Sequence, residues 1–316
     1  MRFNGADQLP LDQEAPIQIL TYRYFLAVAE TGSVRQAAHD LHVSPSAISR
    51  QIQNLEHSFQ TALFDRRSSG MFLTEEGRIL EAHMRNTLRE MDLAKSKIQE
   101  IHGLMAGTVR FATIEGVMRT WLSPAIARFQ RQHGQVTFSG TVTGSPAVYD
   151  QLSSDVVDIG IAMEVDLPAD IEVIERFPTH LIAVARPDHP LAGRDLITLD
   201  ALVGYSLAML NGSFLTRQLI NVASARIGKT FSVVFEIDNI EMLKLHVQAN
   251  GGMTILPSYA ISQVELSRGD LVAIPVQDAA CLACSTVLCK RRDRRMSHAA
   301  RAFIETLRTV PMTTHP

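Results

Sequence analysis

The chain of 316 residues is too long for one compact core, so we expect two or three globular units. Hydrophobic residues at 46% and charged residues at 20% exclude a mainly disordered chain, and the sequence offers neither a secretory h-region nor about 18 uninterrupted apolar residues. These features predict a cytoplasmic protein with no membrane partner, and the net charge of −3 gives no overall sign of nucleic-acid binding.

The N-terminal part divides into a leader and a small helical domain. Residues 1–19 carry three acidic residues and two prolines without periodicity, which indicates a loose leader. The domain is expected over residues 20–77. Apolar residues at helical spacing predict a first helix from Leu20 to Gly32, and Ser33 can cap a second helix behind it.

A third helix is predicted from Ser44-Pro45 to about Phe59, because serine caps free N–H groups and proline suits the first helical position. Its spacing predicts an inward face of Ile48, Ile52, Leu55 and Phe59. The outward face is then Ser46, Ser49, Arg50 and Gln53. Residues 63–67 and 71–73 read as a short hairpin around a turn, which completes a winged helix-turn-helix.

Thr74, with two glutamates behind it, predicts the start of a long helix that runs to about Leu104, and we assign residues 78–106 to a linker. Its apolar residues recur near every 3.5 positions, at Leu80, Met84, Leu88, Met91, Ile98 and Met105. That spacing is typical of a helix that pairs with a second copy of itself, although packing against its own chain is the alternative. We expect a dimerisation helix.

From residue 107 to 316 strand and helix patterns alternate, which favours an α/β fold with crossover helices between parallel strands. The expected strands are residues 108–113, 136–142, 157–163, 180–186, 206–209, 231–237 and 253–256. The expected helices are residues 117–132, 214–227, 239–249 and 297–307.

Three cysteines, Cys281, Cys284 and Cys289, lie within nine residues, an odd count that does not suit a secreted disulfide framework. The apolar residues between them favour packing in a buried strand, with a metal or redox cluster as the alternative. The basic run at residues 290–295 resembles a nucleic-acid patch, but its place before the last helix favours a solvated turn. No motif for a nucleotide, a metal or a catalytic nucleophile is present, so we expect no cofactor, no metal and no enzyme.

Several segments in a specific order resemble a LysR-type transcriptional regulator: FLAVAETGS at residues 25–33, SPSAISRQIQNL at 44–55, VDIGIAM at 157–163 and GGMTILP at 251–257. The resemblance covers nearly everything after residue 19. It implies an N-terminal winged helix-turn-helix, a long linker helix and a C-terminal two-lobed, periplasmic-binding-protein-like α/β effector domain. We place lobe I at residues 107–164 and 278–310 and lobe II at residues 165–277, with crossovers near 164–168 and 274–280.

The family likeness implies a sequence-specific regulator that binds a double-stranded DNA operator. The third helix fits the major groove, where Arg50 can donate two hydrogen bonds to a guanine. Pro45 stands where many family members carry glutamine. The expected DNA contacts are Ser44, Ser46, Ser49, Arg50, Gln53, Arg66, Arg67 and Thr74, with the wing arginines and Thr74 directed at phosphates. The alternative is an ordinary solvated helix face.

The likeness also implies a small-molecule effector bound between the lobes, a homodimer or homotetramer, and action on RNA polymerase. Candidate effector contacts follow strands, at Ile114, Glu115, Gly116, Ser145, Met163, Asn211, Ser213 and Asn239. Family members often carry carboxylate-binding hydroxyls where Ile114 and Gly116 stand, whereas Glu115 can recognise an amine or remain a solvated carboxylate. A solute-binding or transport-associated protein is the alternative function, but it leaves residues 20–104 unexplained.

Overall fold

The computed structural model describes residues 19–102, 105–277 and 284–312, and the chain divides into two compact units between Asp92 and Leu93. Among the described helices, none is long and apolar enough to cross a bilayer.

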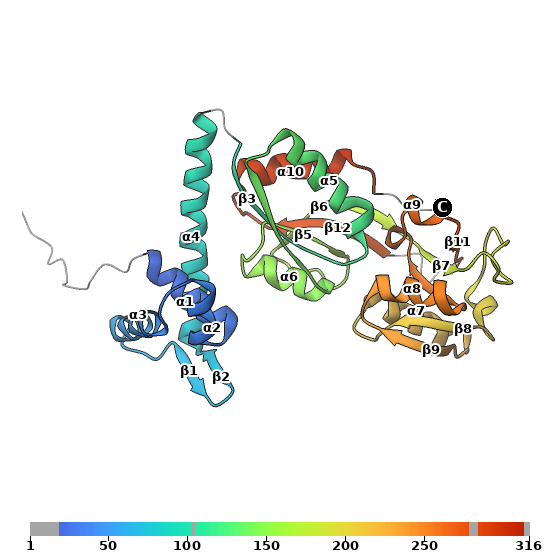
Figure 1. The fold of residues 1–316 in the computed structure, drawn as a ribbon, viewed down its shortest axis with the longest axis horizontal. Helices are drawn as coiled ribbons and strands as arrows, with labels where there is room; N and C mark the ends of the chain where they lie inside the picture. The colour runs from blue at the N-terminus through green and yellow to red at the C-terminus, as the bar shows by residue number, and fades with distance from the viewer. Residues whose placement is uncertain (1–18, 103–104, 278–283, 313–316) are drawn as a thin grey trace, which may run out of the picture. The chain divides into compact units, whose positions relative to one another are not determined.

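The first unit contains three short helices, a two-stranded hairpin and the start of a long helix (Figure 1). Their bounds are α1 (Ile19–Thr31), α2 (Val34–Asp40), α3 (Pro45–Ser58), β1 (Phe64–Arg67), β2 (Gly70–Leu73) and α4 (Glu75–Ile101). The predicted caps are confirmed, since the side chain of Ser33 accepts from the Gln36 amide and that of Ser44 from the Ala47 amide. The winged helix-turn-helix follows from these local signals.

Two expectations for this unit need correction. Phe59 does not lie on the buried face of α3, because the helix ends at Ser58 and the chain turns through Gln60 at a φ of 52°. Phe59 is consequently 45% exposed. The apolar residues of α4 do not form one continuous exposed seam. Met84 is buried in the apolar cluster of the first unit, whereas Met91, Ile98 and Ile101 are exposed.

The second unit contains the end of α4 and then a five-stranded sheet of order β4-β3-β5-β12-β6. Its strands are β3 (Gly107–Thr113), β4 (Val136–Val142), β5 (Ile159–Met163), β6 (Ile171–Thr179) and β12 (Cys284–Arg291). In Figure 1, α5 (Ser123–Gln132) and α10 (His298–Thr309) cover one face and α6 (Ser145–Ser153) covers the other. We call this sheet and its helices the first lobe.

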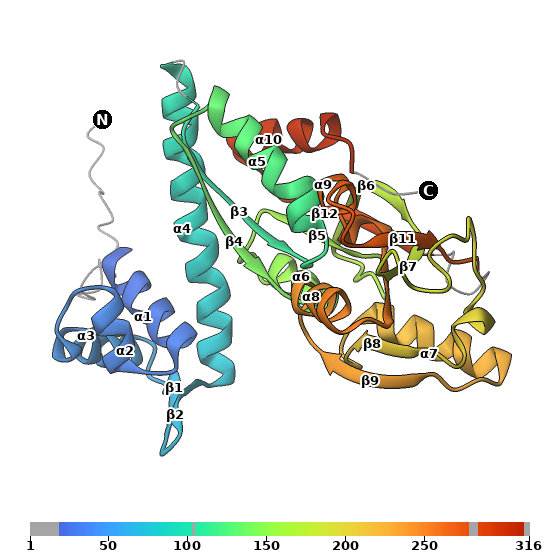
Figure 2. The same ribbon diagram turned by 45° about the vertical axis from the view of Figure 1, so that its right-hand side comes forward.

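The second lobe has its own five-stranded sheet of order β11-β7-β10-β8-β9, which Figure 2 shows from a second angle. Its elements are β7 (Leu181–Ala185), β8 (Ser206–Leu210), α7 (Leu215–Ile227), β9 (Ser232–Ile237), α8 (Ile240–Asn250), β10 (Met253–Pro257), α9 (Gln263–Ser267) and β11 (Val272–Pro275). Leu243 and Val247 of α8 and Ile220 and Ala223 of α7 belong to different apolar clusters, as helices on opposite faces require.

The expected lobe boundary at residue 165 is wrong. Strand β6 was not predicted, because charged residues such as Glu172 and Arg176 hide the apolar pattern of an edge strand. It pairs along its length with β12, so residues 171–179 belong to the first lobe and the chain crosses between lobes next to His180.

The basic run is a solvated turn only in part: Arg292, Asp293 and Arg295 are exposed, but Arg294 is buried in the first lobe. The Arg294 side chain is only 4% exposed and pairs with Asp158 and Asp155. Arg291 also pairs with Asp155, and Lys290 lies 3.3 Å from the Glu172 carboxylate. These side chains anchor the end of β12 and the segment after it to the rest of the first lobe.

Candidate functional site

The outward face of α3 carries the polar side chains that the sequence predicts. Ser46, Arg50 and Gln53 are exposed and Ser49 is partly so, while Ile48 and Ile52 on the other side are buried. The hydroxyl of Ser44 accepts from the Ala47 amide at 3.2 Å, so it caps the helix. The face is therefore open at its N-terminal turns and held from behind by the apolar core.

The hairpin holds its arginines in place while leaving them more than half exposed. The Arg66 Nη2 lies 3.6 Å from the Glu56 Oε2, and the Arg67 Nη2 donates to the Asp65 Oδ2 at 3.0 Å. The Arg67 guanidinium also lies 5.2 Å from the centre of the Phe72 ring. Glu56, which the sequence analysis missed, additionally accepts from the backbone amide of residue 63 at 3.0 Å and so ties α3 to the wing.

Thr74 stands at the start of α4 and uses its hydroxyl within the fold. It donates to the Ala62 carbonyl at 2.9 Å and accepts from the Gly77 amide at 3.0 Å. The hydroxyl hydrogen is therefore already engaged, which leaves the free N–H groups of the helix start as donors for a phosphate.

A cavity of about 620 Å³ lies between the two lobes of the second unit, at the starts of α6, α7 and α8. Neither α6 nor α7 has a side-chain cap. Most of the predicted effector residues line the cavity: Ile114, Glu115, Gly116, Ser145, Met163 and Ser213.

Asn211 and Asn239 fall outside the lining because their side chains serve the neighbouring backbone. Asn211 accepts from the Ser213 amide at 3.1 Å and from its hydroxyl at 2.6 Å. Asn239 caps α8 by accepting from the Met242 amide at 2.8 Å. We therefore assign neither residue to effector contact.

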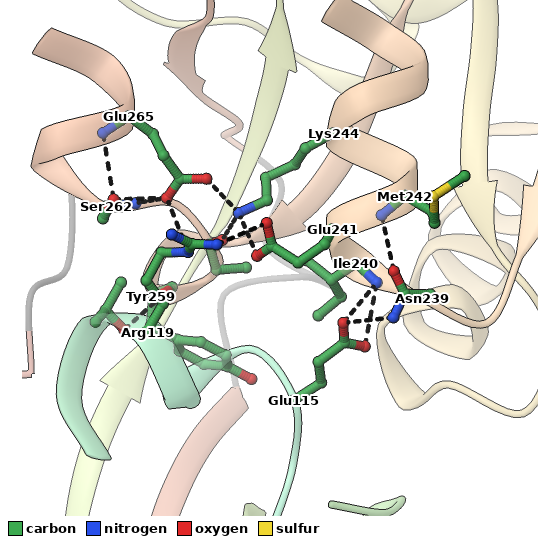
Figure 3. A network of polar contacts seen from close by, with 12 residues as sticks. Glu115, Arg119, Asn239, Ile240, Glu241, Met242, Lys244, Tyr259, Ser262 and Glu265 are labelled. Carbon is green, nitrogen blue, oxygen red and sulfur yellow. Dashed lines mark hydrogen bonds and ion pairs between the residues drawn. The ribbon is translucent and has the colours of Figure 1, made fainter. Parts of the chain in front are cut away.

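Glu115 is engaged differently from either expectation. Both of its carboxylate oxygens lie 3.1 Å from the Ile240 amide, and Oε1 also accepts from the Asn239 side-chain amide at 3.0 Å (Figure 3). The carboxylate thus faces the positive N-terminal end of α8. It is neither a free solvated group nor an open receptor for an amine.

The loop that carries Glu115 approaches the other lobe closely. A Cβ added at Gly116 would lie 2.6 Å from Cε2 of Tyr259, whose side chain is 1% exposed. Thr120 donates to the Tyr259 carbonyl at 2.9 Å. Glycine at position 116 is therefore what permits the contact between this loop and the buried ring.

Sequence reasoning missed several residues of the cavity wall, notably Val142, Thr143, Tyr149, Phe214, Thr216 and Tyr259. The Tyr149 hydroxyl donates to the Met163 carbonyl at 2.7 Å, and the Ser145 hydroxyl accepts from the Met163 amide at 3.0 Å. The sequence signal that could have found Tyr149 is the glycine and proline at the start of α6, which predict a helix with positions 145 and 149 on one face.

The charged residues in the described lining are all acidic: Glu115, Asp150, Asp166 and Asp238.

Cys289 is a buried free thiol in β12, whereas Cys281 lies outside the described residues. The Cys289 Sγ donates to the Gly160 carbonyl at 3.4 Å, and burial raises the pKa of the Cys289 thiol to about 12. Within the described parts of the chain, no three His, Cys, Asp or Glu side chains are grouped to hold a metal ion. Cys289 packs as a small apolar residue.

We expect Cys289 to resist alkylation in the folded protein, because the thiolate is the reactive species and burial disfavours it. Iodoacetamide at pH 8, followed by mass spectrometric localisation of the label, should leave Cys289 unmodified until urea is added. Equal labelling rates with and without urea would contradict the buried assignment.

Two family models match the chain: LysR substrate binding domain over residues 102–311, and bacterial regulatory helix-turn-helix protein, lysR family, over residues 20–78. The RuBisCO operon transcriptional regulator of Allochromatium vinosum is 30% identical over 295 residues, which are 92% of this chain and 95% of that protein. A full-length OxyR variant from Pseudomonas aeruginosa matches with a TM-score of 0.69 at 19% identity, over 93% of this chain and 96% of that one. A full-length CbnR complexed with its target DNA matches with a TM-score of 0.62 at 18% identity, over 93% and 100% of the two chains.

Proposed function

The chain belongs to the LysR family of bacterial helix-turn-helix regulators, and we propose how its residues divide the work of an effector-responsive transcriptional regulator. The DNA-binding domain is assigned to residues 20–77, the linker to 78–106 and the effector domain to 107–316. The regulator binds an operator through its DNA-binding domain, and a small molecule in the interlobe cavity alters the affinity for that operator.

The exposed polar face of α3 carries the proposal for DNA. Arg50 and Gln53 project from the side opposite the buried Ile52, as a helix seated in the major groove requires. A guanidinium can donate two hydrogen bonds to a guanine edge, so Arg50 is assigned to base recognition. Contacts to phosphate and sugar are assigned to Ser44, Ser46, Ser49, Arg66 and Arg67. The expected contact from the Thr74 side chain is replaced by one from the free N–H groups at the start of α4, because the Thr74 hydroxyl donates to the Ala62 carbonyl.

The interlobe cavity supports the proposal for the effector. Its wall contains Ile114, Gly116, Ser145, Met163 and Ser213, which we assign to effector contact. A ligand there touches both lobes, and it changes DNA binding only if it binds one DNA-bound arrangement better than another. The resulting change in spacing between DNA-binding domains alters the action on RNA polymerase.

The exposed half of α4 supports assembly as a homodimer or homotetramer. Met91 and Ile98 are exposed at helical spacing on one chain, and a second copy of the helix would remove them from water. A solute-binding role is not favoured, because it leaves residues 20–78 without a purpose. We assign the chain no catalytic activity.

Arg50→Ala should weaken operator binding by about 1–3 kcal/mol, roughly 5- to 150-fold, because one bidentate base contact is lost. Genome-wide mapping of bound DNA first identifies the operator, and titrations at one fixed salt concentration then compare the variants. Arg128→Ala removes the same charge from an exposed site on α5 and should leave affinity unchanged. Equal affinity of the parent and Arg50→Ala would exclude Arg50 from base recognition.

A further inference from the structure

Glu115 and the N-terminus of α8 form a clasp between the lobes, and the clasp has the chemistry of an occupied carboxylate site. We infer that α8 presents an anion site in the cleft, that the chain fills it with its own Glu115, and that this residue excludes effector carboxylates from that end. The inference rests on the proposed effector cleft for its location, while its chemistry depends only on residues of the second unit.

Two donors hold the Glu115 carboxylate, the Ile240 N–H and the side-chain amide of Asn239. The Ile240 amide is one of the N–H groups that a helix start leaves without an intrahelical acceptor. Both Glu115 oxygens lie 3.1 Å from it, and the Asn239 side chain donates to Oε1 at 3.0 Å. The same Asn239 side chain accepts from the Met242 amide at 2.8 Å, so its amide is oriented with the NH2 group towards Glu115.

The cations near the clasp have acidic partners of their own. Arg119 lies 3.2 Å from Glu241 and 3.9 Å from Glu265 (Figure 3). Lys244, whose side chain is 4% exposed, lies 2.8 Å from Glu241 and 2.5 Å from Glu265 and donates to the Ala260 carbonyl at 3.1 Å. These four side chains balance one another in charge. Glu115 is therefore held by the helix start and by Asn239, not by a neighbouring cation.

The clasp is open to the ligand space, because Glu115 and Ile240 both line the cavity. A dissolved carboxylate that approaches α8 competes with one that is covalently attached and has a high effective concentration. It also meets the repulsion of Asp150, Asp166 and Asp238, which are in the same lining. The α8 end of the cleft therefore selects an uncharged or cationic part of the effector.

Removing the attached carboxylate should make the site available to acetate, which replaces the lost end of the side chain. We compare the full-length parent and Glu115→Ala in sodium acetate and in sodium chloride of equal ionic strength, following thermal unfolding by the fluorescence of Trp121, the single tryptophan. Glu115→Ala should gain a saturable rise in the unfolding midpoint, with half-saturation in roughly the millimolar range. The parent should show no difference between the two salts.

Two further variants make the result specific. Asp150→Ala removes another carboxylate of the cavity wall and should not gain an acetate response, and Glu115→Ala combined with Asn239→Ala should lose the response. Equal acetate effects on the parent, Asp150→Ala and Glu115→Ala would overturn the inference, as would an undiminished response in the double variant.

Glu115→Gln gives an independent measurement if the alanine variant does not fold. Its amide keeps the shape and one acceptor but loses the charge at the helix start, so its unfolding midpoint should lie below that of the parent and of Asp150→Asn. Equal midpoints would also overturn the clasp. Operator titrations of the same variants separate the two proposals, because acetate rescue can succeed whether or not α3 recognises DNA.

Discussion

Arg294→Ala should lower the free energy of unfolding of the second unit by about 3–5 kcal/mol, as expected when one partner of a buried ion pair is removed. The side chain of Arg294 is 4% exposed, and its guanidinium pairs with Asp158 and donates to the Val157 carbonyl. Burial lowers the pKa of Arg294, while Asp158 and then Asp155 raise it, so both carboxylates favour the charged form.

The loss of stability is expected to be large because Arg294→Ala leaves the carboxylate of Asp158 without its cationic partner. The Asp158 side chain is 12% exposed and would keep one backbone donor, the Arg110 amide at 2.8 Å, but no buried positive partner. Arg294→Lys should lie between the parent and the alanine variant, because it retains the charge but not the planar fork of donors.

Urea denaturation followed by Trp121 fluorescence measures this loss, because Trp121 belongs to the same unit. Arg295→Ala provides the control at the next, exposed position, and it should change the free energy of unfolding by no more than about 0.5 kcal/mol. A loss for Arg294→Ala as small as that expected for Arg295→Ala would show that Arg294 makes no buried ion pair.

Ile52→Ala should destabilise the first unit by about 2–5 kcal/mol, because it leaves a cavity beneath α3. Ile52 is 1% exposed and belongs to the one apolar cluster that joins α1, α2, α3 and the hairpin. Small domains bury little apolar surface, so a loss of this size also releases α3 from the position that DNA binding requires.

Hydrogen exchange measured by mass spectrometry on peptides from residues 19–74 tests the Ile52 prediction locally. Gln53→Ala is the matched control one position along the helix, on the exposed side, and should retain the protection of the parent. If both variants exchange equally fast, Ile52 is not the anchor of α3.

The N-terminal unit was predictable because its determinants are local. Ser33 and Ser44 each cap a helix through an amide three residues ahead, so the signal and the structure lie within one turn of chain. The error at Phe59 has a local cause as well, because apolar spacing predicts which side of a helix is buried but not the residue at which the helix stops.

Two polar contacts, one between the lobes and one within the first lobe, could not be predicted from spacing, because their partners are remote in sequence. Glu115 meets Asn239 across 124 residues, and Arg294 meets Asp158 across 136. A basic run before a helix has the same local pattern whether it is solvated or buried. Arg294 is buried because the sheet order places β12 between β5 and β6, and the local sequence does not contain that information.

That sheet order has a consequence for the order in which the chain is made. Strand β12 separates β5 from β6, so the first lobe leaves the ribosome with a gap in its sheet until residues 284–291 have been synthesised. The second lobe is continuous between β7 and β11 and can fold during that interval, since domains generally fold as units while synthesis proceeds. The facing edges of β5 and β6 therefore stay unpaired while more than a hundred further residues are synthesised. Gly160 of β5 and Cys289 of β12, for example, are 129 residues apart in sequence. Until β12 has been made, the facing edges of β5 and β6 are open to pairing with the wrong strand.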